Sequence, residues 1–318
     1  MKFIKIPGIN KRVSKLILGT MTFSPSKMDQ VNSLLDSFLE SGGNTLDTAH
    51  IYNDGKSEKA IGKWLKGRGN RNKVVIIDKG AHPDEYGPRV NPEAITTDLY
   101  ESLDRLQTDY IDIYMLHRDN PDIPVEVIIN TLNDHYNEGR IKAIGVSNWT
   151  NQRIEEANNY AKKNGLIGVS ANSSNLSLAK PNEPMWPGCI SVDECSLNWH
   201  EAVQMPLLSW SSQAGGFFTG RYSPNAVSDE NIARVYYSEE NWERYRRATE
   251  LSEQIGGNTN QIALAYVLQQ PFPISALIGS QNKAELYSSI KALDIHLTTD
   301  QLKWLDLRTK CRGRMGRG

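Results

Sequence analysis

The sequence has few cysteines and almost no net charge. Its three cysteines, Cys189, Cys195 and Cys311, form no C-x-x-C pair of the zinc-binding kind, and an odd, low number is typical of reduced thiols in a cytosol. The 36 basic and 37 acidic side chains leave a net charge of −1, which gives no electrostatic attraction to nucleic acid or to a membrane surface. We therefore predict a cytoplasmic protein without nucleic-acid or membrane partners.

Long apolar segments and metal motifs are also missing. No stretch approaches the roughly 20 apolar residues of a membrane-spanning helix, and Met-Lys-Phe-Ile-Lys-Ile-Pro at the start lacks the core of a secretory signal. Arg312, Arg314 and Arg317 make a basic tail that is too short for a nucleic-acid-binding arm, so we expect a frayed terminus. Without an H-x-H or H-E-x-x-H motif, we predict no bound metal.

Strand-like and helix-like segments alternate along the chain, which favours parallel pairing of the strands. The first strand is followed by Gly-Thr-Met-Thr and not by the G-x-G-x-x-G turn of a doubly wound sheet. Eight such units in 318 residues predict a single-domain (β/α)8 TIM barrel over residues 1–318. The predicted strands are residues 16–18, 45–47, 74–78, 111–116, 141–146, 168–171, 206–210 and 274–278.

Other segments complete this expected architecture. Residues 3–6 and 12–15 flank Pro-Gly-Ile-Asn and predict an N-terminal β-hairpin that could plug the bottom of the barrel. Long irregular loops over 172–191 and 211–238 follow strands six and seven, and loops of this length are usually functional or mobile. Helices are predicted at residues 29–41, 57–66, 92–106, 124–138, 151–163, 193–202, 239–255, 260–268, 283–293 and 299–307.

Three residues suited to proton chemistry end strand-like runs. Asp47 closes Asn-Thr-Leu-Asp, Lys79 closes Val-Val-Ile-Ile-Asp-Lys, and His117 closes Ile-Asp-Ile-Tyr-Met-Leu-His. Tyr52 follows Asp47 by five residues, in the loop beyond the second strand. Side chains at the C-terminal ends of barrel strands face the barrel mouth, where such folds keep their chemistry. We therefore expect all four residues to meet at one site.

This set of residue types could act as acid machinery for reducing a carbonyl group. A free tyrosine has a pKa of about 10, and an adjacent ammonium favours its phenolate. Lys79 could supply that charge, Asp47 could keep Lys79 protonated, and His117 could donate a hydrogen bond to the substrate oxygen. Asp–Lys pairs are also common structural salt bridges and tyrosines line many pockets, so a structural role stays open for each residue.

Four stretches of the sequence resemble the aldo-keto reductase family, and they occur in family order. They are Gly-Gly-Asn-Thr-Leu-Asp-Thr-Ala-His-Ile-Tyr, Ile-Ile-Asp-Lys-Gly, Asp-Tyr-Ile-Asp-Ile-Tyr-Met-Leu-His-Arg and Gly-Arg-Ile-Lys-Ala-Ile-Gly-Val-Ser-Asn-Trp. The resemblance covers essentially the whole chain and implies NADPH-dependent reduction of a small aldehyde or ketone, with NAD(H) not excluded. It makes Tyr52 the general acid, tuned by Lys79 and Asp47, while His117 orients the carbonyl.

The same resemblance implies a nicotinamide dinucleotide site along the barrel mouth. Ser147 and Asn148 would bind the carboxamide, and Trp210 would stack on the ring in place of the usual tyrosine. The loop after strand seven would wrap the pyrophosphate, although a flexible surface loop is the alternative. The full predicted set is Gly19, Thr20, Met21, Asp47, Ser147, Asn148, Ser173, Trp210, Ser211, Ser212, Gln213, Gly215, Gly216, Phe217, Arg221, Gly279, Ser280, Gln281 and Lys283.

Two departures from the family pattern affect this cofactor site. Ser173 stands where the family usually has a glutamine, and Gly-Ser-Gln-Asn-Lys over 279–283 stands where it often has an arginine for the 2′-phosphate. The second departure puts the preference for NADP over NAD in doubt. For the substrate pocket we predict walls from Phe23, Tyr86 and Trp186, with Met21, Met185, Pro187 and Cys189 nearby; packing on a neighbouring helix is an equal alternative for these side chains.

Two functional alternatives remain beside a reductase. One is a nicotinamide-binding sensor or regulatory subunit without turnover, against which the four intact acid-machinery residues speak. The other is a non-redox barrel, such as a lyase or isomerase, which would bind no nucleotide. The sequence carries no prediction of oligomeric state.

Overall fold

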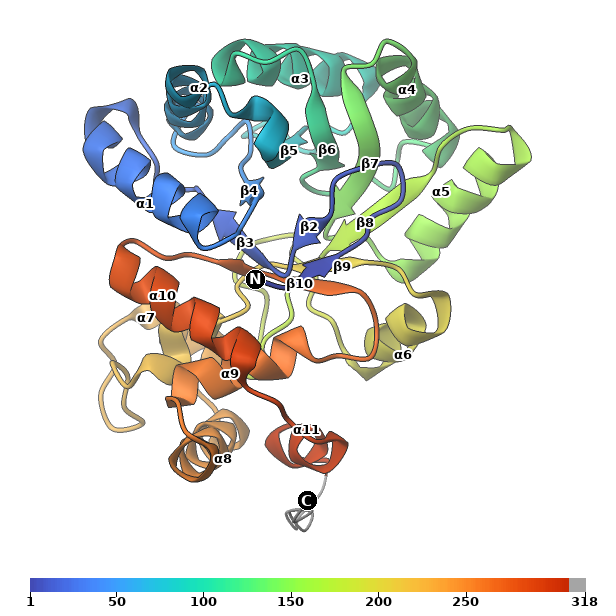
Figure 1. The fold of residues 1–318 in the computed structure, drawn as a ribbon. Helices are drawn as coiled ribbons and strands as arrows, with labels where there is room; N and C mark the ends of the chain where they lie inside the picture. The colour runs from blue at the N-terminus through green and yellow to red at the C-terminus, as the bar shows by residue number, and fades with distance from the viewer. Residues whose placement is uncertain (309–318) are drawn as a thin grey trace.

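A computed structural model describes residues 1–308, in which eight parallel strands form a closed barrel (Figure 1). Cys311 and the three arginines of the predicted tail lie outside the described residues. Around the barrel the order is β10-β3-β4-β5-β6-β7-β8-β9, so the predicted (β/α)8 fold is confirmed. The strands are β3 (Leu16–Gly19), β4 (Thr45–Asp47), β5 (Val75–Gly80), β6 (Ile111–Leu116), β7 (Ile141–Ser147), β8 (Val169–Ser173), β9 (Leu207–Ser209) and β10 (Ile274–Ile278).

Helices cover the outside of the barrel (Figure 1). All ten predicted helices are found, but α7, only seven residues long inside the second long loop, was not predicted by periodicity. Asn91 caps α3 by accepting a hydrogen bond from the Ala94 amide, with Pro92 at the first helical position. The helices are α1 (Met28–Glu40), α2 (Lys56–Arg68), α3 (Pro92–Leu106), α4 (Val125–Asn137), α5 (Asn151–Lys163), α6 (Glu194–Val203), α7 (Glu230–Tyr236), α8 (Glu239–Ile255), α9 (Thr259–Leu268), α10 (Lys283–Lys291) and α11 (Thr299–Leu305), with short 3-10 turns η1 (Pro25–Lys27), η2 (Arg71–Lys73), η3 (Ala214–Thr219) and η4 (Ala292–Asp294).

The predicted N-terminal hairpin closes one end of the barrel. Its strands β1 (Phe3–Ile4) and β2 (Val13–Ser14) pair antiparallel and lie across the centre of the ring in Figure 1. Ile4, Ile6 and Val13 are buried in one apolar cluster with the inward-facing side chains of the barrel strands. Because this plug fills the N-terminal end, only the C-terminal end of the barrel is open to a ligand.

Because side chains alternate along a strand, the apolar ones form two cores, one inside the barrel and one between the barrel and the helices. The same alternation directs polar side chains at the strand ends toward the barrel mouth. On β5, Val75 and Ile77 face the barrel interior, while Ile76 packs outward against the helices. Lys79 continues the inward row of β5 at its C-terminal end. Ile113 and Met115 form the equivalent row on β6. The same period of two that fills the barrel therefore directs the strand-end residues into its mouth.

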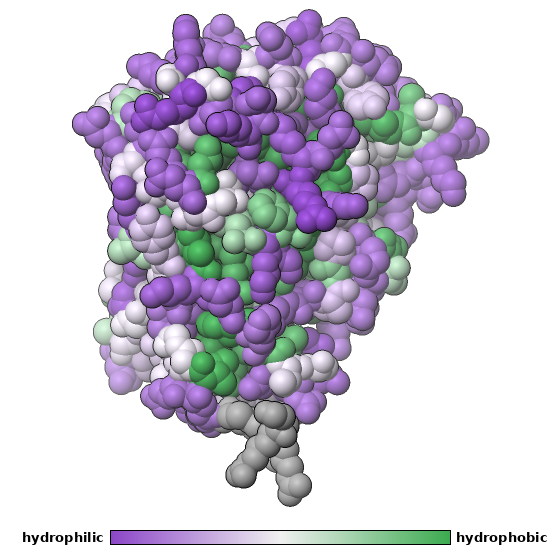
Figure 2. Space-filling model, in the orientation of Figure 1, coloured by the Kyte–Doolittle hydropathy of each residue, from purple (hydrophilic) through white to green (hydrophobic). Residues whose placement is uncertain are grey.

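The face of the molecule seen in Figure 2 is mostly hydrophilic, with hydrophobic side chains in small groups between polar ones. Within residues 1–308, no helix is both long and apolar enough to cross a bilayer. The same part of the chain brings together no group of three or more His, Cys, Asp or Glu side chains that could hold a metal ion.

Candidate active site

A cavity of about 1700 Å³ opens at the C-terminal end of the barrel. It extends from the loops after β4, β5 and β6, across the mouth, to η3, α9 and α10. Cavities of this kind at barrel mouths are the usual place for a ligand. The predicted site residues that line it are Gly19, Thr20, Met21, Asp47, Tyr52, Lys79, His117, Ser147, Asn148, Trp186, Trp210, Ser211, Ser212, Gln213, Gly215, Gly216, Arg221, Gly279, Ser280 and Gln281.

Asp47, Tyr52 and Lys79 meet inside this cavity, and we refer to them as the acid group. The Lys79 ammonium lies 2.7 Å from Asp47 Oδ1 and donates to Tyr52 Oη at 3.3 Å. It also donates to the Thr48 carbonyl at 2.8 Å, which fixes its position further. Neighbouring strands β4 and β5 bring the lysine and the aspartate together. The left-handed turn at Asn53, with φ of 50°, follows Tyr52 directly.

Burial controls the protonation of the acid group. Burial lowers the pKa of Lys79, but the facing Asp47 carboxylate and Tyr52 hydroxyl outweigh it and raise that pKa overall. Burial also raises the pKa of Tyr52, and the Lys79 charge offsets only part of this rise. The expectation that Lys79 makes the phenol acidic is therefore wrong for the net shift. At neutral pH the site presents a protonated phenol next to an ammonium.

His117 follows the C-terminal end of β6 and faces the same space. Its ring meets the Tyr52 ring edge to face, with centroids 5.6 Å apart. Burial, reinforced by the nearby Lys79 charge, lowers the pKa of His117 well below its usual value, so the imidazole is neutral. Its Nδ1 is buried and has no hydrogen-bond partner within residues 1–308. A neutral imidazole with one N–H can donate to a ligand oxygen.

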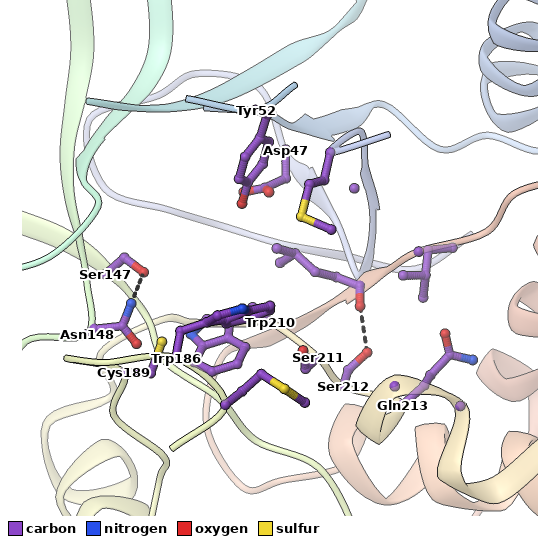
Figure 3. A pocket seen from close by; sticks show the side chains of 18 of the residues that line it. Asp47, Tyr52, Ser147, Asn148, Trp186, Cys189, Trp210, Ser211, Ser212 and Gln213 are labelled. Atoms are coloured by element: carbon purple, nitrogen blue, oxygen red, sulfur yellow. Dashed lines mark hydrogen bonds between the residues drawn. The ribbon is translucent and has the colours of Figure 1, made fainter. Parts of the chain in front are cut away.

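Ser147 ends β7 and Asn148 follows it; both lie on the cavity wall, joined by a hydrogen bond (Figure 3). Asn148 Nδ2 donates to Ser147 Oγ at 2.9 Å, and Ser147 Oγ donates to the Ser173 carbonyl at 2.8 Å. Asn148 Oδ1 accepts from the Ile190 amide at 3.0 Å, which ties the long loop after β8 to the barrel mouth. Asn148 adopts a left-handed φ of 61°, a conformation that asparagine tolerates. These amide and hydroxyl groups could exchange partners with a bound carboxamide.

Two tryptophans lie across the cavity from Tyr52 and Asp47 (Figure 3). The rings of Trp186 and Trp210 are tilted at 45° with centroids 6.0 Å apart. The indole Nε1 of Trp210 is buried without a partner among the described residues. Because buried N–H groups are normally satisfied, this donor lacks a partner that a polar ligand could supply.

The loop after β9 forms η3 and presents its backbone to the cavity. Gly215 and Gly216 have left-handed φ values of 61° and 84°, and a Cβ on Gly215 would meet Ile232 Cδ1 at 2.4 Å. Arg221 lies close to Gly216 and lines the same part of the cavity. Farther along, Asn260 Oδ1 on α9 is buried without a partner inside the described range. Backbone amides, a guanidinium and an unsatisfied amide oxygen fit the phosphates and base of a dinucleotide.

Three predicted cofactor residues do not reach the cavity. Ser173 is buried behind the wall, where its hydroxyl donates to the Leu208 carbonyl at 2.8 Å. Phe217 is fully buried with its ring 4.6 Å from that of Trp242, because neighbouring residues of a tight turn point in different directions. Lys283 is exposed on α10, and its charge acts on Asp36 of α1. These three side chains therefore lie away from the cavity, unlike the other predicted cofactor residues.

Two side chains predicted to form the substrate pocket also lie away from the cavity. Phe23 is buried in the outer core between the barrel and the helices. Tyr86 is 90% exposed at the tip of the loop after β5 and does not line the cavity. By contrast, Met21, Trp186 and Cys189 line the cavity as expected.

His82 and Arg118 also line the cavity, although the sequence patterns did not identify either as a site residue. The His82 ring lies 4.8 Å from that of His117, and its Nδ1 is 2.7 Å from the Pro83 carbonyl oxygen. The left-handed φ of 55° at Ala81 turns the chain there, and no sequence signal predicts this turn. Arg118 follows His117 directly, and alternation would send the two side chains to opposite faces. The strand ends at Leu116, so alternation no longer applies.

Several residues at the far end of the cavity were also not predicted from the sequence. It includes Asn258, Thr259 and Asn260 at the start of α9, and Glu285 and Ser289 on α10. The sequence marks 258–261 only as the beginning of a helix, because Asn258 and Gln261 form a capping box. A helix start that faces a cavity is a ready polar surface, and this combination is visible only once the barrel is folded.

Comparisons with known proteins relate the whole chain to one family. A model described as the aldo/keto reductase family matches residues 15–307. An aryl-alcohol dehydrogenase (NADP(+)) of Phanerodontia chrysosporium is 28% identical, covering 94% of this chain and 83% of its own length. A putative voltage-gated potassium channel subunit beta of Schizosaccharomyces pombe is 26% identical, covering 91% and 87%. The solved structure of a thermostable aldo-keto reductase, Tm1743, in complex with the inhibitor epalrestat, shares the fold with a TM-score of 0.74 at 24% identity, over 96% of this chain and 99% of that one.

Proposed function

This chain belongs to the aldo/keto reductase family, and we propose that it reduces an aldehyde or ketone to an alcohol with a reduced nicotinamide dinucleotide. One observation carries the proposal. Inside the large cavity, Lys79 Nζ contacts Asp47 Oδ1 at 2.7 Å and Tyr52 Oη at 3.3 Å. A phenol held beside an ammonium is suited to give a proton to a developing alkoxide.

Each member of the site has a separate task in this proposal. A reduced nicotinamide, when bound, supplies a hydride to the carbonyl carbon. Tyr52 holds a proton at Oη and releases it to the substrate oxygen, and Lys79 stabilises the phenolate that remains. Asp47 keeps Lys79 charged in a buried position. His117, neutral and edge-on to Tyr52, donates a hydrogen bond that orients the carbonyl.

The remaining lining residues support a dinucleotide along the rest of the cavity. In this proposal Ser147 and Asn148 bind the carboxamide and Trp210 stacks its indole on the ring; all three line the cavity. The left-handed glycines of η3 let backbone amides approach phosphate closely, and Arg221 can pair with its charge. The buried, unpartnered Trp210 Nε1 within the described chain supports a polar ligand here.

The choice between NADP(H) and NAD(H) depends on the far end of the cavity. There the Glu285 carboxylate accepts from the Gln281 amide at 2.8 Å and from Asn282 Nδ2 at 2.9 Å. Within residues 1–308, the part of the lining that β10 and α10 supply contains no lysine or arginine. A carboxylate repels a 2′-phosphate and can accept a hydrogen bond from a ribose hydroxyl. We therefore infer that NADH serves at least as well as NADPH, although the Phanerodontia relative carries NADP(+) in its name.

The test is to mix the protein with NADH or NADPH and a panel of aldehydes and ketones. The proposal expects an aldehyde-dependent loss of reduced-nicotinamide absorbance. Cofactor binding without turnover would favour a sensor or regulatory subunit, the alternative to which the channel-subunit name of one relative points. Absence of any nucleotide binding in a fluorescence titration would favour a non-redox barrel.

A further inference from the structure

The cavity wall next to the catalytic residues holds a buried arginine that has no carboxylate partner. Arg118 is 7% exposed and lines the cavity directly after His117. Its Nη1 donates to the His117 carbonyl at 2.8 Å and its Nε donates to the Pro187 carbonyl at 3.3 Å. Within residues 1–308, no Asp or Glu oxygen forms an ion pair with it. Two backbone carbonyls hold the guanidinium in place but do not neutralise its charge.

The other charged groups at this end of the cavity are paired. Lys79 pairs with Asp47 at 2.7 Å, and the neighbouring Asp119 pairs with Arg153 at 3.3 Å. A buried charge is costly unless it is paired, so an unpaired one at a ligand cavity calls for a ligand of opposite charge.

The guanidinium retains donor capacity that faces the cavity. Its Nη2 takes part in no hydrogen bond with residues 1–308, and it is not among the buried side-chain atoms that lack a partner. The planar fork of arginine matches a carboxylate with two parallel hydrogen bonds. The Arg118 charge also contributes to lowering the pKa of His117 and of His82, which places it close to the reacting end of the cavity.

The rest of this wall is apolar and aromatic. Trp186 lies against Trp210 with centroids 6.0 Å apart, and Met185 and Cys189 line the same stretch. Flat apolar walls favour a flat apolar ligand body. Combined with one unpaired cation, they describe a ligand that is apolar along its body and anionic at one edge.

We propose that Arg118 binds a carboxylate on the substrate, so that this chain reduces carbonyl compounds that carry a carboxylate on an aromatic or other flat apolar frame. The reduction step rests on the function proposed above, whereas the binding of the carboxylate does not. Arg118 is thus a specificity-determining residue, separate from the acid group.

Binding is tested without turnover, on the protein saturated with NADP⁺ and on the free protein. The probes are benzoate and its neutral analogue benzamide, followed by the fluorescence of the cavity tryptophans. Benzoate should bind more tightly than benzamide, and Arg118→Gln should weaken benzoate binding about 30-fold or more. Benzamide binding should stay unchanged, which also shows that the variant is folded. Equal affinity for the two probes, or an unchanged benzoate affinity in the variant, would overturn the proposal.

Two further variants sharpen the binding result. Arg118→Lys keeps the charge but loses the fork, and should keep part of the preference for benzoate. Measured on the free protein, Arg221→Gln removes a second cavity cation that has no ion-pair partner within residues 1–308, and should leave benzoate affinity unchanged, because Arg221 lies on the η3 side of the cavity. A benzoate loss in Arg221→Gln as large as that in Arg118→Gln would place the anion at the cofactor phosphates and overturn the assignment.

Turnover separates this inference from the proposed function. The substrate pair is 4-carboxybenzaldehyde and its methyl ester, and the acid should have the lower KM. Arg118→Gln should raise KM for the acid about 30-fold while leaving the ester within about threefold. Reduction of both compounds with the same KM in the parent would overturn the inference and keep the reductase. Arg118-dependent benzoate binding without reduction of either aldehyde would overturn the reductase and keep the inference.

Discussion

Within residues 1–308, Lys79 and Lys180 each contact one tyrosine and one aspartate, but only the group of Lys79 lines the large cavity. In the acid group, Lys79 Nζ lies 3.3 Å from its tyrosine hydroxyl. In the second group, Lys180 Nζ lies 3.3 Å from Tyr266 Oη and 3.1 Å from Asp306 Oδ1. Burial raises the pKa of both tyrosines, and in both groups the lysine charge offsets part of that rise. Contacts and electrostatics are therefore nearly the same in the two places.

The two groups differ in what surrounds them. Lys79 is 3% exposed and lines the cavity at the barrel mouth, whereas Lys180 is 32% exposed and no member of its group lines the cavity. Lys180 and Tyr266 join the long loop after β8 to α9, and Asp306 follows α11, so the second group ties outer elements together. A lysine beside a tyrosine is thus no evidence of catalysis by itself, and access to a cavity makes the difference.

The largest expected effect comes from Lys79→Met. Removing the ammonium should lower turnover about 10³-fold or more, because the phenolate loses its stabilising charge. It should also cost about 3–5 kcal/mol of folding stability, because Asp47 stays buried and unpaired. The measurements are kcat and thermal unfolding, with Lys79→Met combined with Asp47→Asn to relieve the unpaired charge.

The matched control for that prediction is Lys180→Met. It should keep turnover within about threefold of the parent and cost less than about 1 kcal/mol, because this lysine is partly exposed. If both lysine variants lost turnover equally, the distinction between the two groups would collapse. A parental rate in Lys79→Met would show that its charge does not serve the phenol.

The kcat of reduction should fall tenfold per pH unit only at alkaline pH. Burial raises the pKa of Tyr52, so the phenol keeps its proton well above neutrality. Burial lowers the pKa of His117, so the imidazole is neutral down to acidic pH. We expect kcat to be flat from about pH 6 to about pH 9 and to fall above the Tyr52 pKa. The Tyr266→Phe variant should show the same alkaline fall in kcat as the parent. A fall in the parental kcat already below about pH 8 would contradict its assignment to Tyr52.

A smaller effect is expected at the far end of the cavity. Glu285→Gln removes the carboxylate that faces this end, and should lower KM for NADPH about tenfold with little change for NADH. The ratio of the two KM values before and after the substitution is the measurement. If NADPH were already strongly preferred by the parent, Glu285 would not lie near the ribose, and the inference about NADH would fail.

The acid group could be predicted from the sequence because strand periodicity fixes directions. Asp47 and Lys79 lie at the C-terminal ends of neighbouring parallel strands, and the inward row of Val75 and Ile77 on β5 continues to Lys79 at the barrel mouth. The barrel itself follows from eight strand–helix repeats without a Gly-rich turn. Within a regular strand, the position of a residue in the sequence therefore predicts which side of the strand its side chain faces.

Periodicity stops where strands end, and there the observed side-chain directions differ from the expected ones. Phe217 and Gly216 are neighbours in η3, yet only the glycine reaches the cavity. Tyr86 lies at a solvent-exposed loop tip. Arg118 lines the cavity, although strand alternation after His117 would place its side chain on the opposite face. Single backbone angles, such as the left-handed φ of 55° at Ala81, decide these directions. Such angles follow from tertiary packing and leave no pattern in the chain.

The most direct test of the account measures kcat of Tyr52→Phe and Tyr266→Phe at saturating cofactor and aldehyde. Both substitutions remove one buried hydroxyl at the same distance from a lysine. We predict that Tyr52→Phe loses about 10²- to 10⁴-fold in kcat while Tyr266→Phe stays within about threefold of the parent. Equal rates in the two variants, or a parental rate in Tyr52→Phe, would contradict the claim that the cavity-facing phenol is the proton donor.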